Sequence, residues 1–173
     1  MEFTFQSEYD TKAMTALART MRKTLRKKHS RISHIFAVAI IVLAVIVVVP
    51  LGDKIFVWNT ITFLNLVVAV VLTATLLFED RLNGYIARKR LMPGTENNTA
   101  VFEENSFTTV CEVGTTEWNY ENVLLVAETS NYFVFLYSKN HGQIYTKASM
   151  IGGTLDEFRT LIQEKTGKPI QKL

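Results

Sequence analysis

Residue types that commonly build active sites are scarce in this sequence. It contains one cysteine, Cys111, and three histidines. A lone cysteine has no intramolecular disulfide partner, so its strand-like surroundings predict a buried structural thiol in a reducing compartment. His29 and His34 would not share a helical face and His141 falls in a turn, which argues against a metal site. Because no convergent catalytic set is visible either, we predict a non-enzymatic protein without a cofactor.

Charge is missing from two long runs. Residues 35–51 and residues 55–78 contain no charged side chain. As helices the runs would extend roughly 26 and 36 Å, against a hydrocarbon core of about 30 Å, and Ile32 and Ser33 lengthen the shorter one. Only residues 52–54 separate them, so the sequence predicts a transmembrane hairpin rather than a buried globular hairpin or a cleaved signal peptide. Neither span holds an ionisable group, which disfavours a transporter or pump.

Lys and Arg are concentrated on one side of these spans. Residues 1–34 carry eight of them, residues 79–94 carry four, and the turn at 52–54 carries one. Positive residues favour the cytoplasmic side, so we predict a multi-pass plasma-membrane protein with both termini cytoplasmic, an extracytoplasmic turn at 52–54 and a basic cytoplasmic connector at 79–94.

Residues 8–34 have the pattern of a basic amphipathic helix. Ser7 has capping-box spacing to a carboxylate three residues later, and Met14, Leu17, Met21 and Leu25 recur every three or four residues. This stripe would face either an anionic leaflet or the protein's own C-terminal domain. Nucleic acid is disfavoured, since the segment adjoins a span and lacks interleaved aromatics. The candidate membrane-surface or docking residues are Arg19, Arg22, Lys23, Arg26, Lys27, Lys28, Arg31, Arg88, Lys89 and Arg90.

The charge balance offers one way for the basic segment to dock. Residues 1–34 have a net charge of +5, whereas residues 95–173 hold ten acidic and six basic residues, a net charge of −4. If both lie in one compartment, the segment could contact the acidic domain instead of anionic lipid headgroups. Salt-sensitive contacts of Arg22 to Arg31 with that domain are then expected.

The second run contains uncharged polar residues. Asn59 and Asn65 are the candidate helix–helix contact residues, because amides and hydroxyls within a span often bond to a neighbouring helix. Simple anchorage of the chain is the plain alternative, and assembly into a homo-oligomer is its main competitor.

Residues 95–173 have the pattern of a small cytoplasmic β domain. Tight turn signals separate six short runs that are rich in β-branched and aromatic residues, which predicts an antiparallel meander. The runs are residues 100–104, 107–113, 115–120, 122–128, 132–138 and 143–147. Residues 1–7 also alternate, so we expect Phe3 and Phe5 to add a strand to this sheet, which would help a domain of this size to bury a core.

A helix is expected to close the domain. Thr154 has N-cap character and Glu157 occupies the matching capping-box position. The face with Leu155, Phe158, Leu161 and Ile162 should cover the sheet, and the helix should end near Gly167. A meander followed by one such helix is the outline of a pleckstrin-homology-like barrel. The predicted fold class is therefore an α+β membrane protein, with a two-helix transmembrane hairpin and a small antiparallel β domain carrying a C-terminal helix.

Several stretches resemble the YcxB-like family of bacterial membrane proteins. They are FEENSF from Phe102, WNYENV from Trp118 and DEFR from Asp156, together with the general layout of the chain. The family's Ile-Pro-Lys run before the last helix reads IYTK here, from Ile144 to Lys147, so the lysine is kept and the proline is absent. The resemblance implies a bacterial membrane protein with a pleckstrin-homology-like domain, and no reaction.

These patterns favour a non-enzymatic, membrane-anchored interaction module at the inner face of a bacterial plasma membrane. Its partner would be a protein or an anionic lipid headgroup, and an immunity-type role in a producer of toxic peptides is one specific version. The alternative is a structural subunit of a homo-oligomeric or larger membrane complex. The identity of the partner and the oligomeric state stay open at the level of the sequence.

Overall fold

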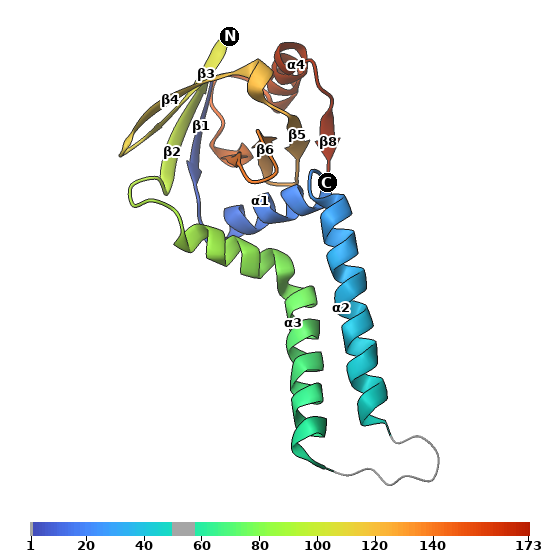
Figure 1. Cartoon of the computed structure of the whole chain (residues 1–173). Coiled ribbons are helices and arrows are strands. Elements are labelled where there is room, and N and C mark those ends of the chain that lie inside the picture. Colours follow the sequence, from blue (N-terminus) through green and yellow to red (C-terminus); the bar gives the residue numbers. More distant parts are fainter. Residues whose placement is uncertain (1, 50–57) are drawn as a thin grey trace.

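The computed structural model describes residues 2–49 and 58–173 and has an α+β architecture (Figure 1). Its strands form two four-stranded sheets. The first sheet has the order β1-β2-β3-β4 and the second has the order β7-β6-β5-β8. In chain order the strands are β1 (Phe3–Glu8), β2 (Asn97–Phe102), β3 (Ser106–Cys111), β4 (Gly114–Asn119), β5 (Leu125–Glu128), β6 (Tyr132–Leu136), β7 (Gly142–Thr146) and β8 (Ile170–Lys172).

The six predicted strands of residues 95–173 are present, but the prediction of one antiparallel meander is wrong. After β4 the chain passes through a short 3-10 turn, Tyr120–Asn122, and begins a second sheet. That sheet ends in β8, which pairs in parallel with β5, with Val126 opposite Ile170. A three-residue strand directly after Pro169 is too short to show any alternation, and its partner lies more than forty residues earlier. The local sequence pattern therefore does not predict this pairing.

The N-terminal residues form the expected extra strand. β1 pairs antiparallel with β2, with Phe3 opposite Phe102 and Glu8 opposite Asn97. Its backbone also bonds to the segment between β7 and α4, since Thr4 and Ile151 exchange two N–H···O bonds of 2.9 Å. The β domain is thus discontinuous in sequence, because three helices lie between its first two strands. A boundary at residue 95 leaves out a strand that the domain contains.

An aromatic core fills the space between the sheets and helix α4 (Leu155–Thr166). Phe3 and Phe5 are fully buried, and the Phe5 ring lies 4.7 Å from Phe158 and 5.6 Å from Phe102 between centroids. Aromatic pairs at such distances contribute about 0.5–1.5 kcal/mol beyond the area they bury. The capping box that the sequence predicts at the start of α4 is present, because Thr154 and Glu157 bond reciprocally.

The basic N-terminal segment is not one helix. Helix α1 covers Thr11–Lys23, and after a turn at residues 24–26 helix α2 covers Lys27–Val48. The predicted cap is also displaced, because Asp10 caps α1 by accepting from the N–H of Ala13 at 2.7 Å, whereas Ser7 belongs to β1. Strand pairing holds Ser7 opposite Asn98, so the helix begins later.

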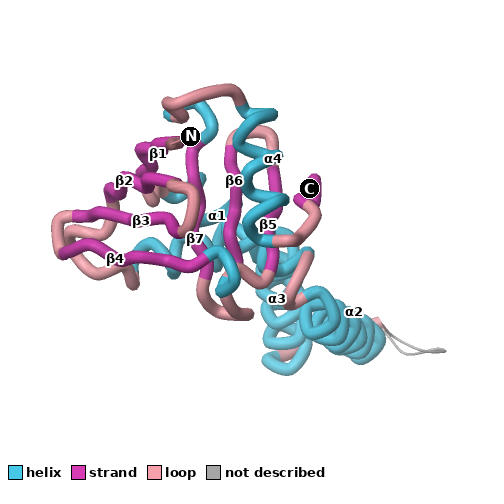
Figure 2. Tube along the Cα trace, turned by 90° about the horizontal axis from the view of Figure 1, so that it is seen from above, coloured by secondary structure: helices cyan, strands magenta, loops and turns pink. Residues whose placement is uncertain are grey.

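Two of the helices are long and apolar enough to cross a membrane, namely α2 and α3 (Thr60–Lys89). In the most apolar 18-residue stretch of each helix, only 6% of α2 and 11% of α3 is buried within the structure. They extend together away from the β domain, and the C-terminal part of α3 turns to run beside α1 (Figures 1 and 2). Helix α3 includes most of the predicted connector at 79–94. The predicted turn at 52–54 lies outside the described residues.

Candidate functional site

Helix α1 packs its apolar stripe on the second sheet. Met14, Leu17 and Met21 are buried and form one cluster with residues of β5, β6 and β7, among them Ala127 and Val134. The stripe therefore faces the protein's own β domain, which decides between the two orientations that the sequence left open. Apolar contacts, rather than ion pairs, hold α1 against the second sheet.

The opposite side of α1 lies directly against α3. A Cβ atom at Gly84 would come within 2.6 Å of the Thr15 Cα, so the two helix backbones meet at this glycine. Beside it, Arg22 Nε donates to Asp80 Oδ1 at 2.6 Å and Arg19 Nε donates to Asp80 Oδ2 at 3.3 Å. Helix α1 is thus held between the sheet and the second apolar helix.

The ten basic residues grouped from the sequence do not form one surface. Arg19 and Arg22 both pair with Asp80 of α3. For Arg22 this differs from the contact with the acidic C-terminal domain that was expected of Arg22 to Arg31 if the segment docked there. Arg26 does reach that domain, but it donates to the Lys139 carbonyl and the Asn140 side chain, both at 2.7 Å.

The other basic residues fall into two groups. On α3, Arg88 donates to Thr11 Oγ1 at 3.2 Å and Lys89 Nζ lies 4.9 Å from the Tyr85 ring centroid. The side chains of Lys23, Lys27, Lys28 and Arg31 are exposed around the start of α2.

The two candidate asparagines have local hydrogen bonds in the structure. Asn59 is the N-cap of α3 and accepts from the N–H of Thr62 at 2.8 Å. Asn65 donates to the Ile61 carbonyl of its own helix at 3.0 Å. Each therefore supports α3 itself, and a contact with another helix stays a prediction.

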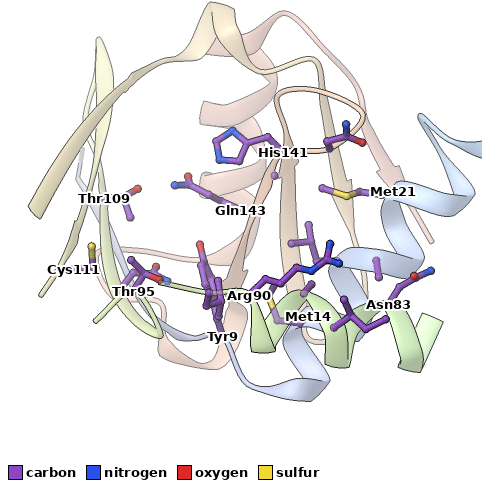
Figure 3. A pocket seen from close by; sticks show the side chains of 18 of the residues that line it. Tyr9, Met14, Met21, Asn83, Arg90, Thr95, Thr109, Cys111, His141 and Gln143 are labelled. Atoms are coloured by element: carbon purple, nitrogen blue, oxygen red, sulfur yellow. The ribbon is translucent and has the colours of Figure 1, made fainter. Parts of the chain in front are cut away.

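A cavity of about 720 Å³ lies between the two sheets, at the end of the domain that faces α1 and α3 (Figure 3). Thr109 and Cys111 line it from the first sheet and Gln143 lines it from the second. Tyr9 and Arg90 approach from the helical side. The cavity is a candidate binding site, since its volume lies within the range of about 300–1,000 Å³ that small-molecule sites occupy.

The cavity wall holds buried polar groups. Asn98 on β2 is 6% exposed and Thr109 on β3 is 8% exposed. Within residues 2–49 and 58–173 neither the Asn98 amide nor the Thr109 hydroxyl has a hydrogen-bond partner of normal geometry. The Tyr9 hydroxyl lies near the Asn98 amide and the Tyr145 hydroxyl lies near Thr109, but neither pair has the geometry of a normal hydrogen bond. An unpaired group of this kind is costly, so a guest molecule with matching polar atoms would be stabilised here.

Two tyrosines hold the polar side chain that β7 contributes to the cavity. The hydroxyls of Tyr137 and Tyr145 both donate to Gln143 Oε1, at 2.7 and 2.5 Å. Burial raises the pKa of both tyrosines, so they stay protonated donors at neutral pH. The Gln143 amide is therefore fixed in orientation by its neighbours.

The cationic character of the cavity comes from Arg26 and Arg90, and its lining residues in the described chain include no Asp or Glu. Anions are therefore favoured over cations in this space. Arg90 was among the predicted surface residues, and it is exposed in the structure while also lining the cavity.

Cys111 also lines the cavity and is only partly buried. The prediction of a buried thiol is wrong, because β3 ends at Cys111 beside the turn to Gly114 and the side chain opens onto the cavity. Asn98, Thr109 and Gln143 were missed by the sequence reasoning. The available signal was a polar residue at an inward strand position, two residues from an aromatic one for Thr109 and Gln143 and two residues from Ala100 for Asn98.

A second polar cluster lies on the same face of the second sheet as the aromatic core, against α4. The buried Glu128 carboxylate bonds to Lys147 and, at 2.7 and 3.0 Å, to Arg159. Lys147 and Arg159 belong to the stretches on which the family resemblance rests. The cluster joins β5, η2 (Lys147–Ser149) and α4, which indicates a structural role.

Neither protein-family models nor curated proteins nor solved structures gave a match to this chain.

Proposed function

We propose that this protein is a non-enzymatic, membrane-anchored interaction module at the inner face of a bacterial plasma membrane. The observation that carries the proposal is the insertion of two exposed, apolar, membrane-length helices between β1 and β2 of one folded domain. Because β1 and β2 pair, the chain must leave and re-enter the same side of a bilayer. The Lys and Arg bias then makes that side cytoplasmic.

The β domain is proposed to be pleckstrin-homology-like and the chain to be YcxB-like. Support comes from two sheets of mainly antiparallel strands around one aromatic core, covered by the C-terminal helix α4. The added strand β8 and the helical insertion after β1 are features of this chain beyond that outline.

Two kinds of surface could serve the module. Lys23, Lys27, Lys28 and Arg31 are exposed just before the apolar part of α2, where each cation would contribute about 1 kcal/mol near an anionic leaflet. A protein partner would instead use the β domain, which α1 and α3 hold rigidly at the membrane.

The topology can be tested with the single native cysteine. In intact cells a membrane-impermeant maleimide should not label Cys111, and it should do so after permeabilisation. In a Cys111→Ser background, Asp53→Cys should be labelled in intact cells, because residue 53 is predicted to lie outside. Labelling of Cys111 in intact cells, with no labelling at position 53, would show that the proposed orientation is inverted.

A structural subunit is the second candidate. Asn65, Thr73 and Thr75 place polar side chains on the apolar part of α3, which is little buried within the chain, and oligomers use such groups. Crosslinking in native membranes separates the two, because a ladder of the chain alone indicates assembly and one distinct partner indicates the interaction module.

A further inference from the structure

The inward face of the first sheet changes character along its strands. On β2 the buried inward residues run from Phe102 to Asn98, and on β3 they run from Phe107 to Thr109. The aromatic ends fill the core, whereas the polar ends line the cavity. Since each buried, unpaired polar group is costly, apolar residues would give a more stable empty domain. The polar ends are therefore suited to a bound molecule.

The opposite wall of the cavity is apolar. Helix α1 contributes Met14, Leu17 and Met21, α3 contributes Ile86, and Leu91 follows the end of α3. Methionine side chains are flexible and polarisable, so they adapt to chains of varied shape. Apart from the amide of Asn83 on α3, the side chains that these two helices contribute to the cavity are apolar and would accept hydrocarbon.

Charge and location restrict the guest further. Arg90 and Arg26 are the ionised groups on the wall. A second hollow of about 580 Å³ shares Arg26 and Asn140 with the cavity and includes Ile32, three residues before the apolar run that begins at Ile35. The cavity thus adjoins the predicted membrane surface on its basic side.

We propose that the cavity binds an anionic amphiphile with a single acyl chain, such as a lysophospholipid or a fatty acid. The chain lies against α1 and α3, the anionic group pairs with Arg90, and polar atoms of the head bond to Asn98 and Thr109. This ligand site rests on the proposed membrane-anchored module, because the bilayer supplies the ligand. A cavity of this volume suits one chain better than two.

The test uses delipidated full-length protein in amphipol, with ligand binding measured by native mass spectrometry. The probes are lysophosphatidylglycerol, palmitate, dipalmitoylphosphatidylglycerol and inorganic phosphate. We expect a 1:1 adduct with at least one of the two single-chain probes, and little or none with the diacyl lipid or with phosphate. Arg90→Gln should weaken the adduct by at least about tenfold, because a charge-assisted contact is lost. Lys89→Gln, which removes the same charge one residue earlier, should leave it unchanged.

A second variant separates ligand binding from folding. Thr109→Val removes an unpaired buried hydroxyl, so the ligand-free protein should melt at the same or a higher temperature while the single-chain adduct weakens several-fold. Thr108→Val, on the outer face of the same strand, should leave binding unchanged.

Three results would overturn the inference: no adduct with either single-chain probe, adducts that both Arg90→Gln and Thr109→Val leave intact, or equal binding of phosphate or diacyl lipid. The cysteine-labelling experiment tells which proposal has failed. Correct topology without an adduct removes only the ligand site, whereas an inverted or absent hairpin removes the membrane-anchored module itself.

Discussion

Glu128 shows how one side chain stabilises the second sheet. It is 5% exposed and bonds to Arg159 of α4 and to Lys147 after β7. The hydrogen bonds from Arg159 are the main reason that its pKa falls from 4.5 to about 2, and Lys147 adds to the effect against the cost of burial. A carboxyl group so displaced contributes about 3 kcal/mol to folding at neutral pH.

Glu128→Gln should therefore remove most of that stabilisation at pH 7. Because the pKa is lower in the folded state, the contribution is complete above about pH 4.5 and is lost as the pH falls towards 2. Melting temperatures of the full-length protein in detergent, measured from pH 2 to 7, should fall in the wild type over this range and change less in the variant. Glu164→Gln, at an exposed position of α4, serves as control. Equal acid sensitivity of wild type and Glu128→Gln would contradict the assignment.

At the scale of elements, α1 joins the β domain to the apolar helices. Its stripe covers the second sheet, its other side meets Gly84 of α3, and Arg22 pairs with Asp80. A single straight helix over residues 8–34 could not bury Met14 on the sheet and also continue into an apolar run directed away from it. The break at residues 24–26 resolves this conflict.

Gly84→Ala tests the α1–α3 contact. In an unconstrained helix this change would stabilise by about 1 kcal/mol. Here the new Cβ would lie 2.6 Å from backbone atoms of Thr15, so we expect a net loss of about 1–3 kcal/mol as the helices separate. Thermal unfolding of the full-length protein in detergent gives the sign of the change in stability. Arg81→Ala, at an exposed position of the same helix, should have little effect on the melting temperature. A higher melting temperature for Gly84→Ala would show that the helices do not touch there.

At the scale of the whole molecule, the β domain is completed by the first residues of the chain. β1 brings Phe3 and Phe5 into the aromatic core and contacts the second sheet through Ser7, whose Oγ accepts from the N–H of Thr146 in β7 at 2.9 Å. The helices follow as an insertion, which fixes the N-terminus and the C-terminal domain on one side of any membrane.

Deleting residues 2–6 should therefore destabilise a domain whose next strand begins at Asn97. Loss of two buried phenylalanines exceeds the cost of a single Phe→Ala change, about 3–5 kcal/mol, and would leave the domain largely unfolded. Limited proteolysis of the membrane-embedded full-length protein should show rapid cleavage within residues 97–173. The Phe36→Ala variant, which lacks an exposed ring on α2, should remain resistant to cleavage within residues 97–173. Unchanged resistance after the deletion would contradict the role of β1.

The sequence by itself determined most elements, because local order encodes them. Alternation at Phe3 and Phe5, the spacing of Met14 and Leu17, the capping box at Thr154 and the two uncharged runs each report on neighbours within a few residues. Tertiary structure decided which of these elements meet. The parallel pairing of β8, the contact at Gly84 and the ion pairs of Asp80 join residues that are far apart in the chain. The cavity belongs to this second group, since Asn98, Thr109, Gln143 and Arg90 become one site only when two sheets and two helices enclose the same space.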